Sequence, residues 1–431
     1  MKQAGKGRTF VGFGFGPIQS GLFVLEAYLS GSFRRFVAAE VDRNLLKAVR
    51  DAGNQYTVNV ARRGGIDRVE VAGVELLDPA RPQDRGRLIQ AIAESNEMAT
   101  ALPSVAHYDA GGQSGAAALI AEGLSRREGP LPTIIYAAEN DNRAAERLSE
   151  AIGRHATAER MAKVQTLNTV IGKMSGVIDD PDEIARLHLA AITPGASRAV
   201  LVEEFNRILI SRVAAPAKRG IAAFIEKEDL LPFEEAKLYG HNAIHALIGY
   251  LAEYEGLRTI AEAGQVAWIM DAARKAFVDE SGRALIHRHA GLGDPLFTPA
   301  GYRAYADDLL ERMTCPFLND LVSRVTRDPL RKLGYGDRLF GTMRLALEAD
   351  VRPVNLALGA AAAVISLLSR RDEAQLPPGI PRSPAELTRQ ALADALAAVW
   401  ACPGDAHRTA LIDLTWEALQ SLLAAGRKKP A

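Results

Sequence analysis

The segment from Phe233 to Tyr250 carries side chains suited to acid–base chemistry. On an α-helix, at about 100° per residue, Asn242 lies about 140° and His245 about 80° around the axis from Lys237. A base, an amide and an imidazole would therefore share one face. A solvated polar stripe is the alternative, but these groups are set among Ala, Ile and Leu, which favours a functional site.

Two imidazoles of this segment, His241 and His245, have the spacing of a helical metal pair. No third ligand and no His-Glu-x-x-His glutamate accompanies them. The cysteines, Cys315 and Cys402, form no Cys-x-x-Cys pair, which argues against a disulfide scaffold or a thiolate site. The sequence therefore predicts no metal.

A glycine-rich turn follows the first predicted strand. The β-rich run 9–16 ends in Gly14 and Gly16, and Gly21 comes shortly after. Glycines at such a turn let the backbone approach a pyrophosphate and let the next helix point its N-terminus at it. Gln19 stands where the strict G-x-G-x-x-G pattern has its third glycine, and a purely structural turn is the alternative.

An acidic residue ends the second predicted strand. Glu40 follows Gly14 by 26 residues, close to the spacing at which a carboxylate binds the ribose hydroxyls of a dinucleotide. An acid there repels a 2'-phosphate and so favours NAD over NADP, while Arg43 weakens that preference. We predict that Gly14, Gly16, Gly21 and Glu40 bind NAD.

Two asparagines of the same half are further candidates. Asn140 follows the buried run 131–138, at the sheet edge where cofactors lie, and Asn168 follows another short apolar stretch. Asparagine is also a common turn-former, so a structural role is open for each.

A basic run extends from Arg324 to Arg338. Arg331, Lys332 and Arg338 are the members we single out, because arginine forks bind a phosphate bidentately. A solvated surface explains the same charges equally well, so both interpretations stay open.

The elements that must position these groups fall into two parts. Strands alternate with helices over residues 9–53, and a further buried strand is predicted at 131–138, which indicates a doubly wound, mostly parallel α/β sheet. Period-two alternation over 68–75 predicts a small hairpin around Ala72-Gly73 attached to that sheet.

From about Leu231 onward, Ala- and Leu-rich stretches carry helical periodicity. The sequence predicts an α/β dinucleotide-binding domain over 1–230 and an all-α substrate and catalytic domain over 231–431.

The balance of charged residues limits the kinds of partner that this protein is expected to bind. The 431 residues include 52 Lys and Arg against 52 Asp and Glu, so there is no global field to attract nucleic acid or a membrane. The N-terminus lacks the apolar run of a secretory signal, and the apolar stretch 354–368 is shorter than a membrane span. We expect a cytoplasmic protein that acts on a small molecule.

Taken together, these residues resemble the polyol-specific long-chain dehydrogenases, the mannitol dehydrogenase family. The resemblance is carried by the segment from Lys237 to His245 with Tyr250 and Gly256 after it, and by Ala137-Ala-Glu-Asn140 and Val202-Glu-Glu-Phe205. The run 328–339 resembles the segment that marks the branch acting on phosphorylated polyols.

The resemblance implies a Rossmann domain followed by a helical domain, NAD dependence without a metal, and a monomer. It implies reversible oxidation of a sugar alcohol to a ketose, with mannitol 1-phosphate and fructose 6-phosphate as the expected pair. Lys237 would be the general acid/base, Asn168 and Asn242 would hold the reacting oxygen, and His245 would orient the substrate. Burial would lower the pKa of Lys237 toward neutrality.

Two departures from the family pattern keep alternatives open. The family's Val-Asp-Arg-Ile is replaced by Ile171-Gly-Lys-Met174, and the glycine turn carries Gln19. A free-polyol or sugar-acid oxidoreductase of the same family is one alternative, acting for example on altronate or mannonate. A protein that binds a dinucleotide or sugar without turning it over is the alternative from another class.

Overall fold

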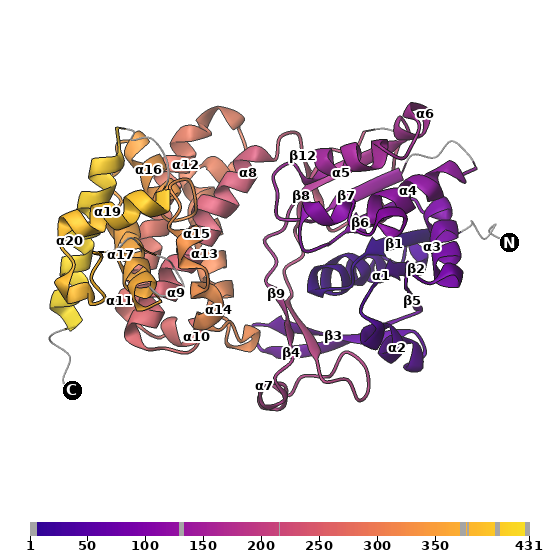
Figure 1. The fold of residues 1–431 in the computed structure, drawn as a ribbon, viewed down its shortest axis with the longest axis horizontal. Coiled ribbons are helices and arrows are strands. Elements are labelled where there is room, and N and C mark those ends of the chain that lie inside the picture. Colours follow the sequence, from indigo (N-terminus) through magenta and orange to yellow (C-terminus); the bar gives the residue numbers. More distant parts are fainter. Residues whose placement is uncertain are drawn as a thin grey trace. The chain divides into compact units, whose positions relative to one another are not determined.

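A computed structural model describes residues 7–128, 133–214, 216–370, 376, 379–400 and 406–426. The chain divides into two compact units, Met1–Leu231 and Pro232–Ala431. Figure 1 shows the first unit in indigo to magenta and the second in pink to yellow. Each unit is described by itself.

The first unit is built on a mostly parallel sheet of eight strands. Its order across the sheet is β12 (Ile225–Lys227), β11 (Leu209–Ser211), β8 (Val164–Val170), β7 (Thr133–Ala137), β6 (Glu97–Thr100), β1 (Arg8–Phe13), β2 (Phe33–Ala39) and β5 (Val74–Leu77). Only β11 and β8 pair antiparallel among these neighbours. The expected α/β architecture is confirmed.

Both faces of this sheet are covered. The helices of the unit are η1 (Gln19–Val24), α1 (Leu25–Leu29), α2 (Arg43–Asp51), α3 (Pro82–Glu94), α4 (Ala116–Ser125), α5 (Ala144–Gly153), α6 (Ala158–Met161) and α7 (Pro181–Arg186). Successive residues of β1 point to opposite faces. Phe10 packs in one core cluster with Val200, and Val11 packs in the other with Leu88 and Leu148.

A second sheet has the order β4 (Gly65–Ala72), β3 (Gln55–Arg62), β10 (Ala199–Glu203) and β9 (Ser175–Ile178). The hairpin predicted around Ala72-Gly73 is wrong, because β4 pairs with β3, which precedes it in the chain. Gly73, at φ +76°, instead leads the chain from β4 into β5 at the edge of the main sheet. Period-two alternation around a glycine is compatible both with a hairpin and with two strands that join different sheets. The strand with which each segment pairs distinguishes the two.

The first helix begins as a π-helix, η1, where the sequence predicts a regular helix. Gln19 lies over the glycine of β1: a Cβ built on Gly12 would be 2.2 Å from Gln19 Nε2. In the usual pattern, the third glycine lets the helix approach the strand closely. Here Gly12, in the strand itself, permits that approach.

In the described residues of the second unit, the secondary-structure elements are all helices, as expected. Its helices are α8 (Leu231–Glu235), η4 (Ala236–Asn242), α9 (Ala243–Glu255), α10 (Ile260–Ala263), α11 (Ala267–Lys275), η5 (Ala276–Gly282), α12 (Arg283–Arg288), α13 (Pro299–Met313), α14 (Val322–Thr326), α15 (Pro329–Lys332), α16 (Phe340–Glu348), α17 (Val354–Ser369), α19 (Arg389–Trp400) and α20 (Arg408–Gly426). The apolar stretch 354–368 forms α17, which packs between α9 and α20 (Figure 1). Within the described residues, no helix is both long and apolar enough to cross a membrane.

Candidate active site

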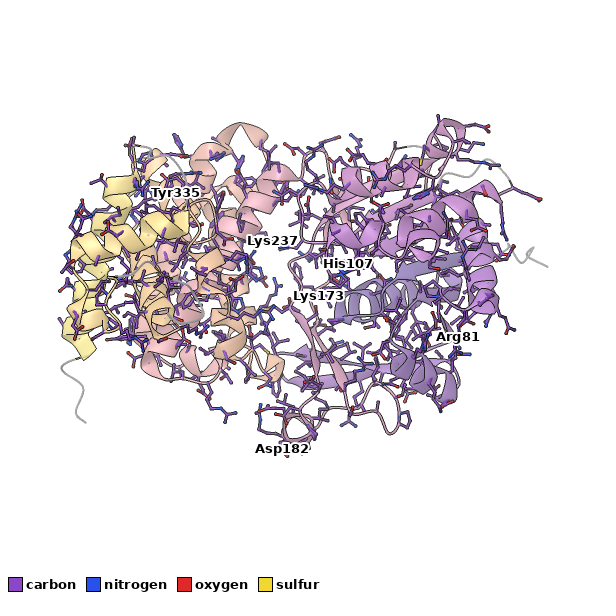
Figure 2. The ribbon with its side chains drawn as sticks, viewed as in Figure 1. Arg81, His107, Lys173, Asp182, Lys237 and Tyr335 are labelled. Carbon is purple, nitrogen blue, oxygen red and sulfur yellow. The ribbon has the colours of Figure 1, made fainter. Side chains whose placement is uncertain are left out.

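A cavity of about 730 Å³ lies in the first unit beside the glycine turn. It is lined by residues 13–18, 39–41, 101–103 and 114–116, together with His107. These segments follow the carboxyl ends of β1, β2 and β6, the edge at which parallel sheets bind ligands. Figure 2 labels His107, whose Nδ1 is 3.0 Å from Ser104 Oγ.

Two glycines of the turn make room for a ligand. Gly14 has φ +79°, and a Cβ there would be 2.9 Å from the carbonyl oxygen of Ala101. Its N–H donates to the Ala39 carbonyl at 2.9 Å, which ties the turn to β2. A Cβ on Gly16 would meet no atom within 4 Å, so the backbone there is open to a close approach.

Gly21 does not line this cavity. A Cβ on Gly21 would be 2.4 Å from Val202 Cγ1 of β10. The close packing of η1 on the second sheet therefore explains this glycine without a ligand.

The carboxylate of Glu40 lines the cavity and also holds the glycine turn. It accepts hydrogen bonds from the backbone N–H of Phe15 at 2.8 Å, Val41 at 2.7 Å and Asp42 at 2.8 Å. A carboxylate has about four acceptor positions, so one remains for a ribose hydroxyl. Arg43 is mostly exposed and lies 3.8 Å from Asp78.

Asn140 is exposed just after β7, and the buried residue at this strand end is its neighbour Glu139. Glu139 accepts hydrogen bonds from Thr100 Oγ1 at 2.9 Å, Tyr108 Oη at 2.5 Å and the Leu102 N–H at 2.9 Å. It thereby fixes the loop that lines the cavity. Glu139 was not among the predicted site residues, although an acid directly after an apolar strand was the available signal.

Asn168 lies near the end of β8 and caps α5. Its Oδ1 accepts from the Ala145 N–H at 2.8 Å, and its Nδ2 donates to Glu146 Oε2 at 2.8 Å. An amide nitrogen carries two hydrogens, so one N–H of Asn168 remains for a ligand.

The departure at Gly172-Lys173 has a structural consequence. Lys173, labelled in Figure 2, is buried, and its Nζ donates to the carbonyls of Glu203 at 2.5 Å and Phe205 at 2.9 Å. These hydrogen bonds connect the segment that follows β8 to the end of β10 and to the residues after it.

In the second unit, Lys237 and Asn242 lie on η4, and His245 lies on the first turn of α9. The π geometry differs from the α-helix assumed from the sequence, and π-bulges are frequent at functional sites. The carbonyl of Tyr239 within η4 accepts hydrogen bonds from Ser281 Oγ at 2.8 Å and Thr342 Oγ1 at 3.2 Å. Neighbouring helices thus support the bulge.

The pKa of Lys237 is lowered, as the sequence analysis expected from burial. Desolvation is the largest cause; the carboxylate of Glu234 opposes it, and the positive charge of Arg338 adds to it. A lowered pKa makes the neutral amine more available as a base. Figure 2 labels this lysine.

His245 is held by an acid that the sequence analysis missed. Its Nε2 is 2.7 Å from Oδ2 of the buried Asp320, whose Oδ1 accepts from Arg324 Nη2 at 2.6 Å and Nε at 3.0 Å. Burial raises the pKa of Asp320, but His245 and Arg324 outweigh it and keep the pKa below its usual value. Asp320 therefore accepts a hydrogen bond from Nε2–H, which in the neutral imidazole leaves Nδ1 of His245 as an acceptor.

The second imidazole, His241, is buried, and its ring centroid is 6.2 Å from that of His245. Burial, and then the neighbouring His245, hold its pKa well below the usual value. Among the described residues, no group of three His, Cys, Asp or Glu side chains could hold a metal ion.

The three cations of the basic run have different environments. Lys332 is buried, donates to the carbonyls of Val325 and Arg327, and has a pKa lowered by burial to about 8. Arg331 is exposed and donates to Asp328 at 2.7 Å. Arg338 is largely buried and bonds Asp337 at 2.8 Å. Because its charge acts on Lys237, Arg338 is the member that belongs with the catalytic candidates.

Comparison with known proteins finds a family match in the second unit. Residues 229–379 match the family model of the mannitol dehydrogenase C-terminal domain. The resemblance to the mannitol dehydrogenase family inferred from the sequence is confirmed.

The curated relatives include two mannitol-1-phosphate 5-dehydrogenases. The protein from Halalkalibacterium halodurans is 28% identical over 361 residues, which cover 81% of this chain and 86% of the relative. The protein from Shouchella clausii is 28% identical over 355 residues, which cover 80% and 85%.

Solved structures share the fold at low identity. A D-sorbitol dehydrogenase in substrate-free form is 14% identical with a TM-score of 0.73, covering 97% of this chain and 93% of that one. A Pseudomonas fluorescens mannitol 2-dehydrogenase, solved with NAD and D-mannitol, is 14% identical with a TM-score of 0.66, covering 99% and 96%.

Proposed function

We propose that this chain is an NAD-dependent, metal-independent dehydrogenase that interconverts a sugar alcohol and a ketose, with mannitol 1-phosphate and fructose 6-phosphate as the pair. One observation carries the proposal: within the region matched by the mannitol dehydrogenase C-terminal domain, Lys237 has a lowered pKa and shares one helical segment with Asn242 and His245. Both curated relatives described above bear the name of this activity.

The first unit has features that fit a dinucleotide. The cavity of about 730 Å³ combines the open backbone at Gly16, the left-handed Gly14 and the carboxylate of Glu40. The nicotinamide ring accepts a hydride from an alcohol when the cofactor is bound. We assign Glu40 to the adenosine ribose, where its charge disfavours a 2'-phosphate and selects NAD.

We assign the proton transfer to Lys237. In alcohol oxidation its neutral Nζ takes the hydroxyl proton, and in ketose reduction its ammonium returns that proton. Asn242, and the remaining N–H of Asn168, donate hydrogen bonds to the reacting oxygen as it gains negative charge. Nδ1 of His245 accepts a hydrogen bond from a neighbouring substrate hydroxyl.

The substrate is tested by following NADH oxidation at neutral pH with four compounds in parallel: fructose 6-phosphate, fructose, tagaturonate and fructuronate. Turnover restricted to fructose 6-phosphate supports the proposal, and a parallel series with NADPH tests the cofactor preference. Bound NADH without turnover of any of the four contradicts the proposal and favours a binding protein.

Replacing Arg338 by Gln is expected to raise the KM for fructose 6-phosphate by about 10- to 100-fold, since a hydrogen bond to a charged group contributes about 1.5 to 3 kcal/mol. The matched control is Arg331→Gln, because Arg331 is exposed and paired with Asp328. Steady-state kinetics with both sugars checks this. An equal loss with unphosphorylated fructose would contradict a phosphate contact at Arg338.

A second candidate, oxidation of an unphosphorylated polyol, is favoured by one observation. Lys332 is buried on backbone carbonyls, and Arg331 is paired with Asp328. Two of the three cations are therefore already engaged within the basic segment. Activity on fructose alone would select this candidate.

A further inference from the structure

A second cavity lies within the helical unit, and Lys237, Asn242 and His245 are not among its lining residues. Its volume is about 460 Å³, and its walls come from η5, α12, α13 and the turn that follows α16. A volume of this size is typical of small-molecule sites. Figure 1 labels α12 and α13, from which most of the lining residues come.

Two arginines and a histidine, all exposed to solvent, line this cavity. Arg283 and His287 are one turn apart on α12, and Arg303 comes from α13. In the part of the chain that the structure describes, none of the three makes a hydrogen bond or an ion pair. Arg288 and Arg312, on the same two helices, are by contrast paired with carboxylates. The unpaired arginines are therefore those that face the cavity.

The charge of the lining is positive. Asp279 is the single acid among the described lining residues, which also include two guanidinium groups and an imidazole. An anion in the cavity would meet two planar forks with donors in fixed geometry, which suit the oxygens of a phosphate.

The wall formed by Tyr302 is rigid. The Tyr302 Oη is 3.1 Å from Ser281 Oγ, and the ring packs against two glycines. A Cβ on Gly282 would be 2.7 Å from the ring, and a Cβ on Gly240 would be 2.7 Å from the hydroxyl. Tyr302 is only 1% exposed, so it forms a rigid floor, and the more accessible apolar side chains of the lining are Val278, Ile286 and Pro299.

We propose that this cavity binds a small phosphate monoester, with the phosphate held by Arg283, Arg303 and His287 and the organic part against Ile286 and Pro299. Neither the catalytic proposal nor the assignment of Arg338 is needed for this site, because its lining contains neither Lys237 nor Arg338.

Isothermal titration calorimetry of the full chain tests the site with three probes: inorganic phosphate, glycerol 3-phosphate and phenyl phosphate, with glycerol and phenol as uncharged controls. We expect the monoesters to bind more tightly than inorganic phosphate. The double variant Arg283→Gln/Arg303→Gln is expected to bind them roughly tenfold or more weakly, since two charged contacts are lost.

Two control variants define the outcome. Arg274→Gln/Arg389→Gln removes the same charge from exposed, paired arginines and is expected to leave binding unchanged. Arg338→Gln removes the cation near Lys237 and is also expected to retain binding. Binding that is unaffected by the Arg283/Arg303 variant, binding that is lost in Arg338→Gln, or no preference for monoesters over inorganic phosphate would each overturn the proposal. Melting temperatures of all variants establish that they are folded.

Discussion

Replacing Lys237 by alanine is expected to lower the turnover of fructose 6-phosphate by about 10² to 10⁴-fold, the usual contribution of a positioned acid or base. NADH affinity, measured by fluorescence titration, is expected to stay near the wild-type value, because Lys237 lies in the helical unit and the proposed cofactor cavity is lined by residues of the first unit. A variant that keeps more than about a tenth of the activity would show that Lys237 is not the base.

Two further lysine variants sharpen this experiment. Lys237→Arg keeps the positive charge but supplies no base, because arginine does not lose its proton at accessible pH, so it is expected to fail like alanine. Lys275→Ala removes an exposed lysine paired with Asp271 and is expected to leave turnover unchanged. Activity in Lys237→Arg would mean that the site needs only a cation.

The lowered pKa of Lys237 also sets the sign of the pH dependence. Alcohol oxidation needs the neutral amine, so its kcat/KM is expected to rise as pH increases through a pKa below 10.5. Ketose reduction needs the ammonium and is expected to fall over the same interval. Pre-steady-state profiles in both directions check this, and parallel changes in the two directions would contradict a proton transfer at Lys237.

Replacing Asp320 by Asn is expected to lower kcat/KM by about 10²-fold. The carboxylate fixes the tautomer of His245 by accepting from Nε2, whereas an asparagine amide can donate to Nε2 and move the proton to Nδ1. Asp320 would be a positioning residue, since it acts through His245. Nitrogen-15 chemical shifts of His245 report the tautomer directly and would not respond to a merely structural change.

A double-variant cycle separates positioning from stability. If Asp320 acts through His245, adding Asp320→Asn to His245→Ala is expected to cause little further loss of activity. Asp307→Asn removes an exposed carboxylate paired with Arg274 and serves as the matched control. Additive losses, or an unchanged His245 tautomer in Asp320→Asn, would refute the positioning role.

The local sequence was sufficient for the main architecture and for part of the candidate site. Strand–glycine–helix alternation predicted the α/β unit around Gly14, and helical periodicity after Leu231 predicted the all-α unit. Glu40 lines the cavity beside the glycine turn, because the ends of neighbouring parallel strands meet at one edge of a sheet.

The spacing of residues along the sequence could not identify interaction partners that lie far apart in the chain. The alternation around Gly73 was the same whether the strand turned back on itself or entered another sheet, and pairing with β3 decided between these arrangements. Likewise, nothing near His245 in the chain pointed to Asp320, which is 75 residues away and meets the imidazole only through the packing of the helices.

The two kinds of unit, the glycine turn and the residue types of the candidate catalytic segment could be predicted from the sequence, because they depend on local periodicity and on the chemistry of single side chains. Which charges remain available depends on the packing of the folded chain. This packing buried Lys332 on backbone carbonyls, engaged Asn168 with α5 and left Arg283 and Arg303 facing a cavity. The physical reason is that desolvation and hydrogen-bond partners are set by neighbours in space, and these are unrelated to distance along the chain.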